Sequence, residues 1–381
     1  MVTDTGISMT ESPQTNRFDV LEIERVIHAI LRAAGANEAS ATAVTRALIT
    51  ASRMGTDSHG LRLLPHYVRA LEGGRINPEP RIQFTPLMPA TGRVDADNGF
   101  GHPAAYDAIG YAVEMAKTIG IGGVSIINSS HFGAAGVYAV AAAEAGMIAW
   151  TFSHSDAFVL PHNGTQAFHG TNPIAFAAPL GNGKPYLLDM ATSAVPWNRV
   201  EQYKGIGRSL PADVAGDASG EVTTDPNQVA ALLPLGGKAF GFKGMGLASM
   251  VEVLSAPLTG MANGARLLPM IGDDMHSYRH LGHFVLAMNP AAFVDSEHFL
   301  DGMQQYLDDL RAQPARGSEP VMAPGDREWQ CQMERDRLGI PIDTFNQQAY
   351  AELTHRFGVA PLAPLGCNGQ LSTTDDEGKQ L

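Results

Sequence analysis

Two histidines in polar surroundings are the first candidates for acid/base chemistry. His59 lies in the segment TDSHGLRLLPHY, together with Ser58, Arg62 and Tyr67, and His131 follows a β-branched run and precedes a glycine-containing turn. Imidazole titrates close to neutral pH, so it can give a proton to a developing alkoxide and recover it. Each segment also has a structural interpretation: Ser58 could cap a helix, and His131 could be bonded at the end of a strand.

Arg62 adds a second chemical function to the first segment. A guanidinium group presents two parallel donors and can hold a carboxylate by both oxygens. With His59 or Tyr67 orienting the bound molecule, this combination would suit hydride addition to a carbonyl carbon beside a carboxylate. The alkoxide formed in that reaction must take a proton, which a histidine can supply.

Hydride chemistry suggests a nicotinamide cofactor, but the glycine fingerprint of the Rossmann fold is weak here. The nearest match is Gly99, Gly101 and Ala104 in DNGFGHPAA. That fingerprint requires a buried apolar strand directly before it, and the charged residues Arg93 and Asp95 occupy this place. We therefore predict that a dinucleotide binds in another way.

Polar groups at the ends of two other expected strands could contact such a cofactor. The turn at residues 170–173 leads into an apolar strand, and Asp189 and Thr192 end another. Donors at such ends suit a ribose or pyrophosphate, although ordinary turns contain the same residue types. Lys243 lies in FGFKGMGLASM at the start of a helix, where it could hold phosphate; a tightly packed helix start is the alternative.

Two groups of histidines have spacings that could suit a metal ion. The groups are His154, His162 and His169 with Asp156, and His276, His280 and His283. Neither matches a catalytic zinc pattern, and 13 histidines in 381 residues produce such spacings by chance. We predict no metal site, and a metal-dependent hydrolase is the alternative function from another class.

The composition favours a globular chain with a large core. Its 381 residues are 44% hydrophobic, and 26 basic against 39 acidic residues give a formal charge of -13. This charge repels nucleic acid and anionic lipid, and no apolar run approaches the roughly 18 residues that cross a bilayer. With only Cys331 and Cys367 present, we expect no disulfide framework and a cytoplasmic location.

The elements that would position these residues are mixed helices and strands. Helical spacing predicts helices over 18–34, 38–53, 102–118, 134–145 and 244–260. Short apolar runs predict strands over 124–127, 147–152, 174–178, 186–190 and 284–288. Residues 213–228 should form a surface excursion. Residues 1–17 and 361–381 lack periodicity and are expected to be disordered tails.

Together, the identity and order of these motifs resemble one family, the type-2 malate/L-lactate dehydrogenases. The match runs over residues 18–358 and includes DSHG, VDADNGFG, NSSHFG, GTNPIAFAAP, DMATS, KGMGL and PGD. Members reduce 2-oxo acids in malate, lactate, ureidoglycolate, sulfolactate and diketogulonate systems, and some reduce cyclic imines that carry a 2-carboxylate. All of these reactions transfer hydride beside a carboxylate.

The resemblance implies an α+β fold that is not Rossmann, with N-terminal helices and a largely antiparallel sheet. It predicts a single catalytic unit over residues 18–360, composed of a helical, substrate-side part (18–120), a cofactor-binding core (121–290) and a C-terminal helical part (291–360). It also implies a homodimer with the site near the subunit interface.

The resemblance further implies roles for individual residues. His131 and His59 are the catalytic candidates, since members of the family have been assigned one or the other. The residues expected to bind substrate are Ser58, Arg62, Tyr67 and Asp156. The residues expected to bind NAD or NADP are Ser155, Thr171, Pro173, Asp189, Met190, Ala191, Lys243, Pro324, Gly325 and Asp326.

Two positions depart from the family pattern. The family commonly places an arginine four residues after the DSHG histidine, whereas Leu63 holds that place here and Arg62 comes one residue earlier. One residue on a helix is about 100° of rotation, so the carboxylate grip would shift. Arg199 replaces a common lysine in PWNRV, which argues against a direct cofactor role there.

The sequence therefore predicts an NAD(P)-dependent oxidoreductase that transfers hydride between nicotinamide and C2 of a small 2-oxo or 2-hydroxy acid. The alternatives are an NADPH-dependent reductase of a cyclic imine 2-carboxylate, the metal-dependent hydrolase, and a catalytically inactive dinucleotide-binding protein.

Overall fold

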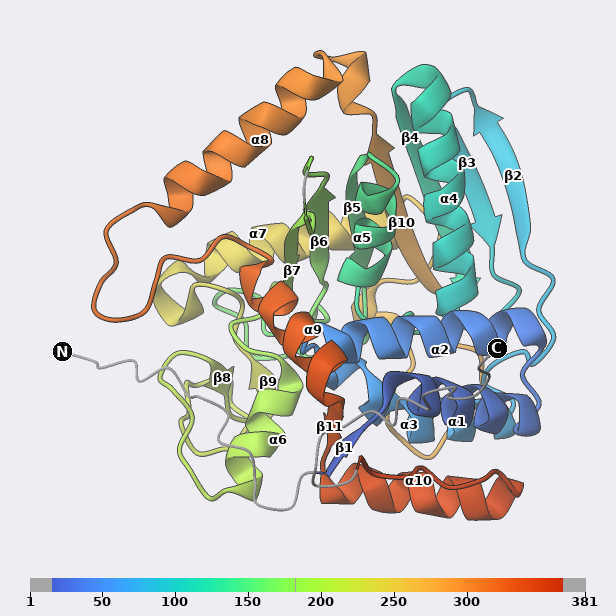
Figure 1. Ribbon diagram of the computed structural model, residues 1–381. Helices are drawn as coiled ribbons and strands as arrows, with labels where there is room; N and C mark the ends of the chain where they lie inside the picture. Colours follow the sequence, from blue (N-terminus) through green and yellow to red (C-terminus); the bar gives the residue numbers. More distant parts are fainter. Residues whose placement is uncertain (1–15, 182, 366–381) are drawn as a thin grey trace, which may run out of the picture.

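A seven-stranded sheet forms the centre of the computed structural model, which describes residues 16–181 and 183–365. Its strand order is β2-β3-β4-β10-β5-β6-β7 (Figure 1). The strands are β2 (Gln83–Met88), β3 (Thr91–Asp95), β4 (Ile121–Ser129), β10 (Leu281–Met288), β5 (Ile148–Ser153), β6 (Ile174–Ala178) and β7 (Tyr186–Met190). Only the pair β3–β4 is parallel. The prediction of a largely antiparallel sheet is confirmed.

Helices cover both faces of this sheet (Figure 1). Helices α4 (Gly101–Ile119) and α5 (Gly136–Glu144) lie on one face, where alanines such as Ala108 and Ala139 are fully buried. Helix α7 (Gly237–Ser255) packs on the other face through Val251, against Phe152 and Ile174. Small side chains on α4 and α5 let these helices lie close to the strands.

A helical layer lies beyond one end of the sheet (Figure 1). It contains α1 (Val20–Ala33), α2 (Glu38–Arg53), α3 (Leu64–Glu72) and α10 (Thr344–Phe357). In α1 the residues at helical spacing, from Ile23 to Leu31, are buried, and the Asp19 side chain accepts hydrogen bonds from the first free backbone N–H groups. Each large aliphatic side chain buried in this way contributes roughly 1.5–3 kcal/mol.

The two ends of the described chain pair with each other. Strand β1 (Asn16–Phe18) is antiparallel to β11 (Ile340–Ile342), and Leu365 N donates to Arg17 O. The predicted tails were therefore wrong for residues 16–17 and 361–365, because pairing partners more than 300 residues apart leave no local periodicity. The rest of both predicted tails lies outside the described residues.

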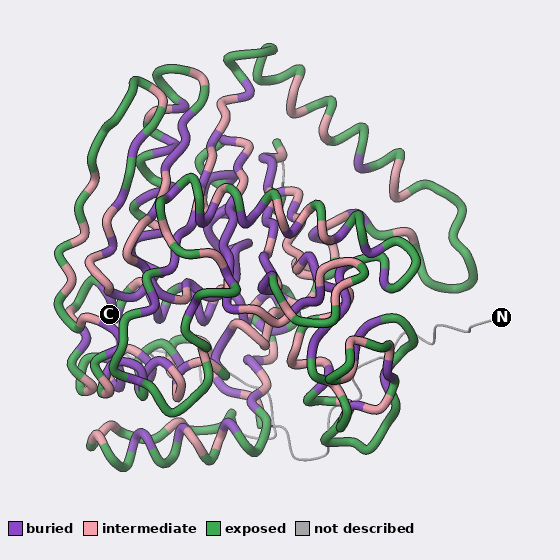
Figure 2. Tube along the Cα trace, turned by 180° about the vertical axis from the view of Figure 1, so that it is seen from behind, coloured by how far each residue is buried: buried purple, intermediate pink, exposed green. Residues whose placement is uncertain are grey.

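The remaining segments surround this frame. Helix α6 (Trp197–Gly205) and the strand pair β8 (Ala215–Gly216) and β9 (Ala231–Leu232) form a small lobe. Val214 and Leu232 are buried in it. The predicted surface excursion over 213–228 forms part of this lobe, including β8. Helix α8 (Ser296–Arg311) is largely exposed (Figure 2), and its Leu307 is buried. Helix α9 (Asp326–Leu338) packs against α2. No described helix is both long and apolar enough to cross a membrane.

The segment before Gly99 contains a strand that the sequence analysis did not predict. This strand, β3, has Gly92 and Val94 buried and Arg93 exposed, so it is not the buried apolar strand that the Rossmann fingerprint requires. The start of α4 is also closed: a Cβ on Gly101 would lie 2.8 Å from Phe132 Cβ, and His102 is fully buried. A pyrophosphate therefore has no room there, and the sheet also crosses the predicted boundary at residue 120.

Candidate active site

A hydrogen bond between Tyr67 and His131 defines the centre of the candidate site. Tyr67 Oη lies 2.7 Å from His131 Nδ1, and Gly133 N donates to the same nitrogen at 3.4 Å. Because a backbone N–H can only donate, Nδ1 acts as the acceptor and Nε2 carries the proton of the neutral ring. His131 thus presents an N–H donor on the side away from Tyr67.

His59 completes this centre. Its ring stacks on that of His131 with centroids 5.7 Å apart, and Ser58 Oγ lies 2.9 Å from His59 Nδ1. The structure therefore brings together four residues that the sequence predicted from two separate segments: Ser58, His59, Tyr67 and His131.

Burial dominates the protonation of these rings. It lowers the pKa of His131 well below its ordinary value, and the positive charge of Arg279 acts in the same direction. Burial also lowers the pKa of His59. Both imidazoles are therefore neutral near pH 7, and an anion bound beside them would oppose these shifts.

The turn that carries His59 is held by the C-terminal helices. It consists of two 3-10 segments, η1 (Asp57–His59) and η2 (Leu61–Leu63). Arg335 on α9 forms an ion pair with Asp57, and Tyr350 on α10 donates to Leu61 O at 3.1 Å. Residues almost 300 positions away thus fix this part of the site, which the short motif could not show.

Arg62 and Arg279 differ sharply in their surroundings. Arg62 is exposed on η2 and forms no hydrogen bond or ion pair within residues 16–181 and 183–365. Arg279 is buried, binds Asp156 through an ion pair and donates to Leu268 O, and its charge lowers the pKa of both His131 and His66.

The sequence analysis missed Arg279, because it lies in an irregular segment, HSYRHLGHF, that we considered only as a metal pattern. Asp156, predicted to contact substrate, has both carboxylate oxygens engaged: one binds Arg279 and the other accepts from Met270 N. Asp156 therefore holds Arg279 in place, and its predicted contact with substrate stays a prediction.

The strands β5, β6 and β7 bring six of the predicted cofactor residues together. Ile174 lies opposite Met190, and Ala175 opposite Asp189, while Thr192 N donates to Thr171 O at 2.9 Å. The six are Ser155, Thr171, Pro173, Asp189, Met190 and Ala191. Asn172, which lies in the turn predicted at residues 170–173, joins them: it is fully buried with φ of 34°, and its Oδ1 accepts from Ser155 N.

The Asp189 side chain has a structural partner. Its Oδ2 accepts from Gly136 N at 2.9 Å, at the first residue of α5, and a Cβ on Gly136 would lie 2.6 Å from that oxygen. Burial raises the pKa of this carboxyl to about 7. Asp189 therefore caps α5 from the neighbouring strand, independently of any bound molecule.

The other predicted cofactor residues lie outside this group of six, on α7 and in the turn that begins α9. Lys243 is exposed on α7, with Nζ 5.5 Å from the centre of the Phe240 ring. Pro324 O accepts from Leu187 N, so the turn through Gly325 lies at the opposite end of β7 from Met190. The carboxylate of the third turn residue, Asp326, is held by Arg311 through two hydrogen bonds.

Residues of the two histidine groups with metal-like spacing have other partners. In the described ranges, no three His, Cys, Asp or Glu side chains gather as a metal site would require. His154 contacts Glu252, and His283 lies between Ser153 Oγ and Ser129 Oγ. The geometry therefore gives no support to the metal-dependent hydrolase.

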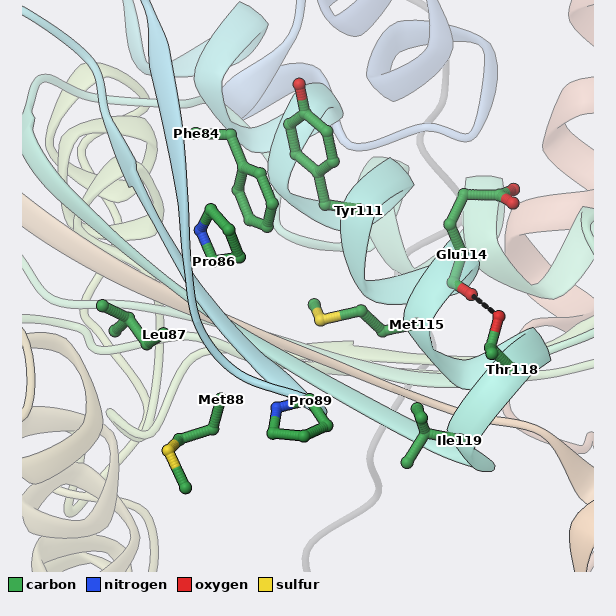
Figure 3. A pocket seen from close by; sticks show the side chains of 10 residues that line it. All are labelled: Phe84, Pro86, Leu87, Met88, Pro89, Tyr111, Glu114, Met115, Thr118 and Ile119. Carbon is green, nitrogen blue, oxygen red and sulfur yellow. Dashed lines mark hydrogen bonds between the residues drawn. The ribbon is translucent and has the colours of Figure 1, made fainter.

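An apolar groove of about 620 Å³ lies between β2 and α4, away from the histidines (Figure 3). Its walls include Phe84, Leu87, Tyr111 and Ile119, and Glu114 is its only ionisable carboxyl group. It joins the second half of α4, whereas the first half carries His102 beside Tyr67. This groove contains no acid/base pair and is not the active site.

Comparison with known proteins decides the family. The family model described as Malate/L-lactate dehydrogenase matches residues 18–352. The chain belongs to the malate/L-lactate dehydrogenase family. The chain is therefore a dehydrogenase of this family. Two of its relatives are named for their cofactor, a ureidoglycolate dehydrogenase (NAD(+)) and a (2R)-3-sulfolactate dehydrogenase (NADP(+)).

Individual relatives match nearly the whole dehydrogenase. It is 36% identical over 340 residues to a malate dehydrogenase of Pyrococcus abyssi, covering 87% of this chain and 92% of the relative. It is 31% identical to a Delta(1)-pyrroline-2-carboxylate/Delta(1)-piperideine-2-carboxylate reductase of Pseudomonas putida, covering 88% and 96%. The crystal structure of malate dehydrogenase from Entamoeba histolytica matches with a TM-score of 0.86, 28% identity and coverage of 91% and 99%. The expected non-Rossmann fold is confirmed.

Proposed function

We propose that this dehydrogenase transfers hydride between C2 of a small 2-oxo or 2-hydroxy acid and NAD or NADP, with His131 as the proton donor and acceptor. The observation that carries the proposal is the Tyr67–His131 hydrogen bond, with Gly133 N as a second donor to Nδ1. It directs Nε2 at the site. In the reduction, the imidazolium form of His131, which a bound carboxylate favours, would give its Nε2 proton to the developing alkoxide and return to the neutral ring; in the oxidation the neutral ring would take that proton back.

The remaining roles follow from position and charge. Arg279 attracts the substrate carboxylate, and His59 supports the ring of His131 by stacking. The hydroxyl and backbone groups at the ends of β5, β6 and β7, with the ammonium of Lys243, fit the phosphates and riboses of a dinucleotide. NAD or NADP supplies or accepts the hydride when bound.

Replacement of the histidines tests this assignment. We expect His131→Ala to lower kcat by on the order of 10² to 10⁴ and His59→Ala to lower it less, with cofactor binding retained in both. Tyr67→Phe should lower kcat by about tenfold through loss of one hydrogen bond, whereas Tyr111→Phe in the distant groove serves as the control. Turnover of His131→Ala near that of the wild type would contradict the proposal.

A cyclic imine is the second candidate for the substrate. The relative from Pseudomonas putida is named for two cyclic imine carboxylates, and a proton from His131 Nε2 would serve a C=N nitrogen as well as an oxygen. Pyruvate, oxaloacetate and a cyclic imine 2-carboxylate, each tested with NADH and with NADPH, separate the two. Consumption of only the imine would favour the second candidate.

We further propose a cytoplasmic homodimer in which a second copy covers α7. The helix exposes Phe242, Met250 and Val253 on the side opposite its buried residues Gly244 and Val251. Exposed apolar clusters of this kind mark protein interfaces. Val253→Glu should reduce the mass measured by light scattering to that of one chain, whereas Leu87→Glu on the β2 surface should leave it unchanged.

A further inference from the structure

Glu252 on α7 is a buried carboxylate that binds three separate segments of the chain. His154 Nδ1 lies 3.3 Å from Glu252 Oε1, Gly264 N donates to the same oxygen at 2.6 Å, and Asn172 Nδ2 donates to Oε2 at 2.7 Å. The residue is 7% exposed. A carboxylate withdrawn from water in this way is tolerated only when hydrogen bonds replace its hydration.

The proton on His154 can be assigned from its second partner. Gly282 N, at the start of β10, lies 3.1 Å from His154 Nε2 and can only donate. Nε2 therefore accepts, and Nδ1 carries the proton that His154 donates to Glu252. Through this ring Glu252 connects the end of β5 with the start of β10.

The segments joined through Asn172 and His154 carry residues of the proposed site. Asn172 accepts from Ser155 N and donates to Ala248 O as well as to Glu252. Asp156, two residues after His154, binds Arg279, three residues before Gly282. Glu252 is thus connected, through Asn172 and His154, to the predicted cofactor residue Ser155 and to the segment that binds Arg279, whose charge lowers the pKa of His131.

The charge on Glu252 is part of this arrangement. Burial alone would raise its pKa, but the hydrogen bonds from His154, Asn172 and Gly264 together lower the pKa below its ordinary value. Glu252 is therefore ionised at neutral pH. All three of its partners are donors, so an amide in its place would direct an N–H group at another N–H group.

We propose that Glu252 is a positioning residue of this dehydrogenase, which acts through His154 and Asn172 to hold the segments that bind cofactor and substrate. The proposal rests on the proposed function for the substrate side, since Arg279 is there assigned to the carboxylate. His131 and Tyr67 lie outside the network, because none of their hydrogen bonds involves Glu252, His154 or Asn172.

The variant Glu252→Gln in the full chain tests the proposal, with Glu221→Gln as the matched control. Glu221 is an exposed carboxylate whose ion pair with Lys238 lies outside the site. We expect Glu252→Gln to raise the Kd of NADH or NADPH, measured by fluorescence titration, and the KM of the acid substrate by about tenfold each. The kcat at saturation should stay within about threefold, because the proton donor is untouched.

A purely structural role gives the opposite pattern. If kcat falls in proportion to the folded fraction while KM and Kd are unchanged, or if Glu252→Gln matches Glu221→Gln in all three constants, the proposal is wrong. Should Glu252→Gln fail to fold, His154→Gln breaks the same link from the other side and must show the same rise in Kd and KM.

The cofactor titration separates this proposal from the proposed function. A wild-type protein that binds NADH or NADPH but reduces no 2-oxo acid or imine would contradict the function. The effect of Glu252→Gln on the cofactor Kd would still decide the positioning role.

Discussion

At the scale of single residues, the site depends on which nitrogen of each histidine carries the proton. Backbone N–H groups fix this choice twice, Gly133 for His131 and Gly282 for His154. Such partners cannot reverse their direction as a hydroxyl can. The protonation pattern of the site is therefore determined by the fold of the main chain as well as by its side chains.

The two arginines permit a direct comparison of substrate contacts. We expect Arg279→Lys to raise the KM of the acid substrate by roughly 10- to 100-fold, because lysine keeps the charge but loses the planar, two-point geometry. Arg62→Lys should change KM less than threefold, since Arg62 is exposed on η2. Steady-state kinetics of both variants at saturating cofactor provides the measurement. A larger effect at Arg62 would make this residue the carboxylate ligand instead.

At the scale of elements, helices and strands with a regular apolar side were predictable. The expected strands over 174–178 and 186–190 coincide with β6 and β7, and the helix over 38–53 with α2. Strand β3 was not predicted. The charged, exposed Arg93 lies between the two buried residues Gly92 and Val94, and it hid the alternation of buried and exposed side chains. Helix α9 lacks an apolar stripe: its buried residues, Gln332 and Arg335, are polar.

The candidate site was predictable only as a set of motifs. Residues within polar turns, such as His59 and His131, could be found from residue type and spacing. Arg279 and Glu252 could not. Arg279 lies in a segment without a recognisable pattern, and Glu252 is one residue of a predicted helix; each becomes significant only through contacts over about 100 residues. The predicted division into parts at residues 120 and 290 stays a prediction.

Asp189 gives a prediction about α5. Its pKa of about 7 lies above the ordinary value of 3.8, so the folded state binds this proton more tightly than the unfolded state. Stability should therefore fall as the pH rises from about 4 to 7, by at most about 4 kcal/mol and by less because the residue is only partly buried.

Asp189→Asn removes this ionisation while its amide oxygen can still accept from Gly136 N. Denaturant unfolding of the cofactor-free protein at pH 5 and pH 8 measures the difference. The wild type should lose more stability than the variant between these two pH values. Equal losses would show that the Asp189 carboxyl does not titrate in this range.

At the scale of the whole molecule, the first and last described segments close the helical layer around the site. Phe18 is 3% exposed between the helices and β11, and the C-terminal helices hold the turn of His59. Substitutions in these two segments should therefore lower the stability of the folded state and, as a result, the activity.

Phe18→Ala tests this closure. Removal of a buried phenylalanine side chain costs about 3–5 kcal/mol, and the midpoint of urea unfolding should fall accordingly. Leu21→Ala is the control, because Leu21 is 73% exposed three residues later. A Phe18→Ala variant as stable as Leu21→Ala would show that β1 contributes little to the folded state.

The edge strand β2 has a consequence for how copies of the molecule meet. Strand β2 is at one edge of the sheet, so its outer side pairs with no other strand of that sheet. Apolar residues of β2, such as Leu87 and Met88, are exposed. Pro86 lacks an N–H to offer, and the register shifts between Pro86 and Met88. Proline and bulges at an edge prevent regular pairing with another chain. At the β2 edge the sheet is therefore protected against the addition of a strand from another copy, although an apolar groove is exposed beside it.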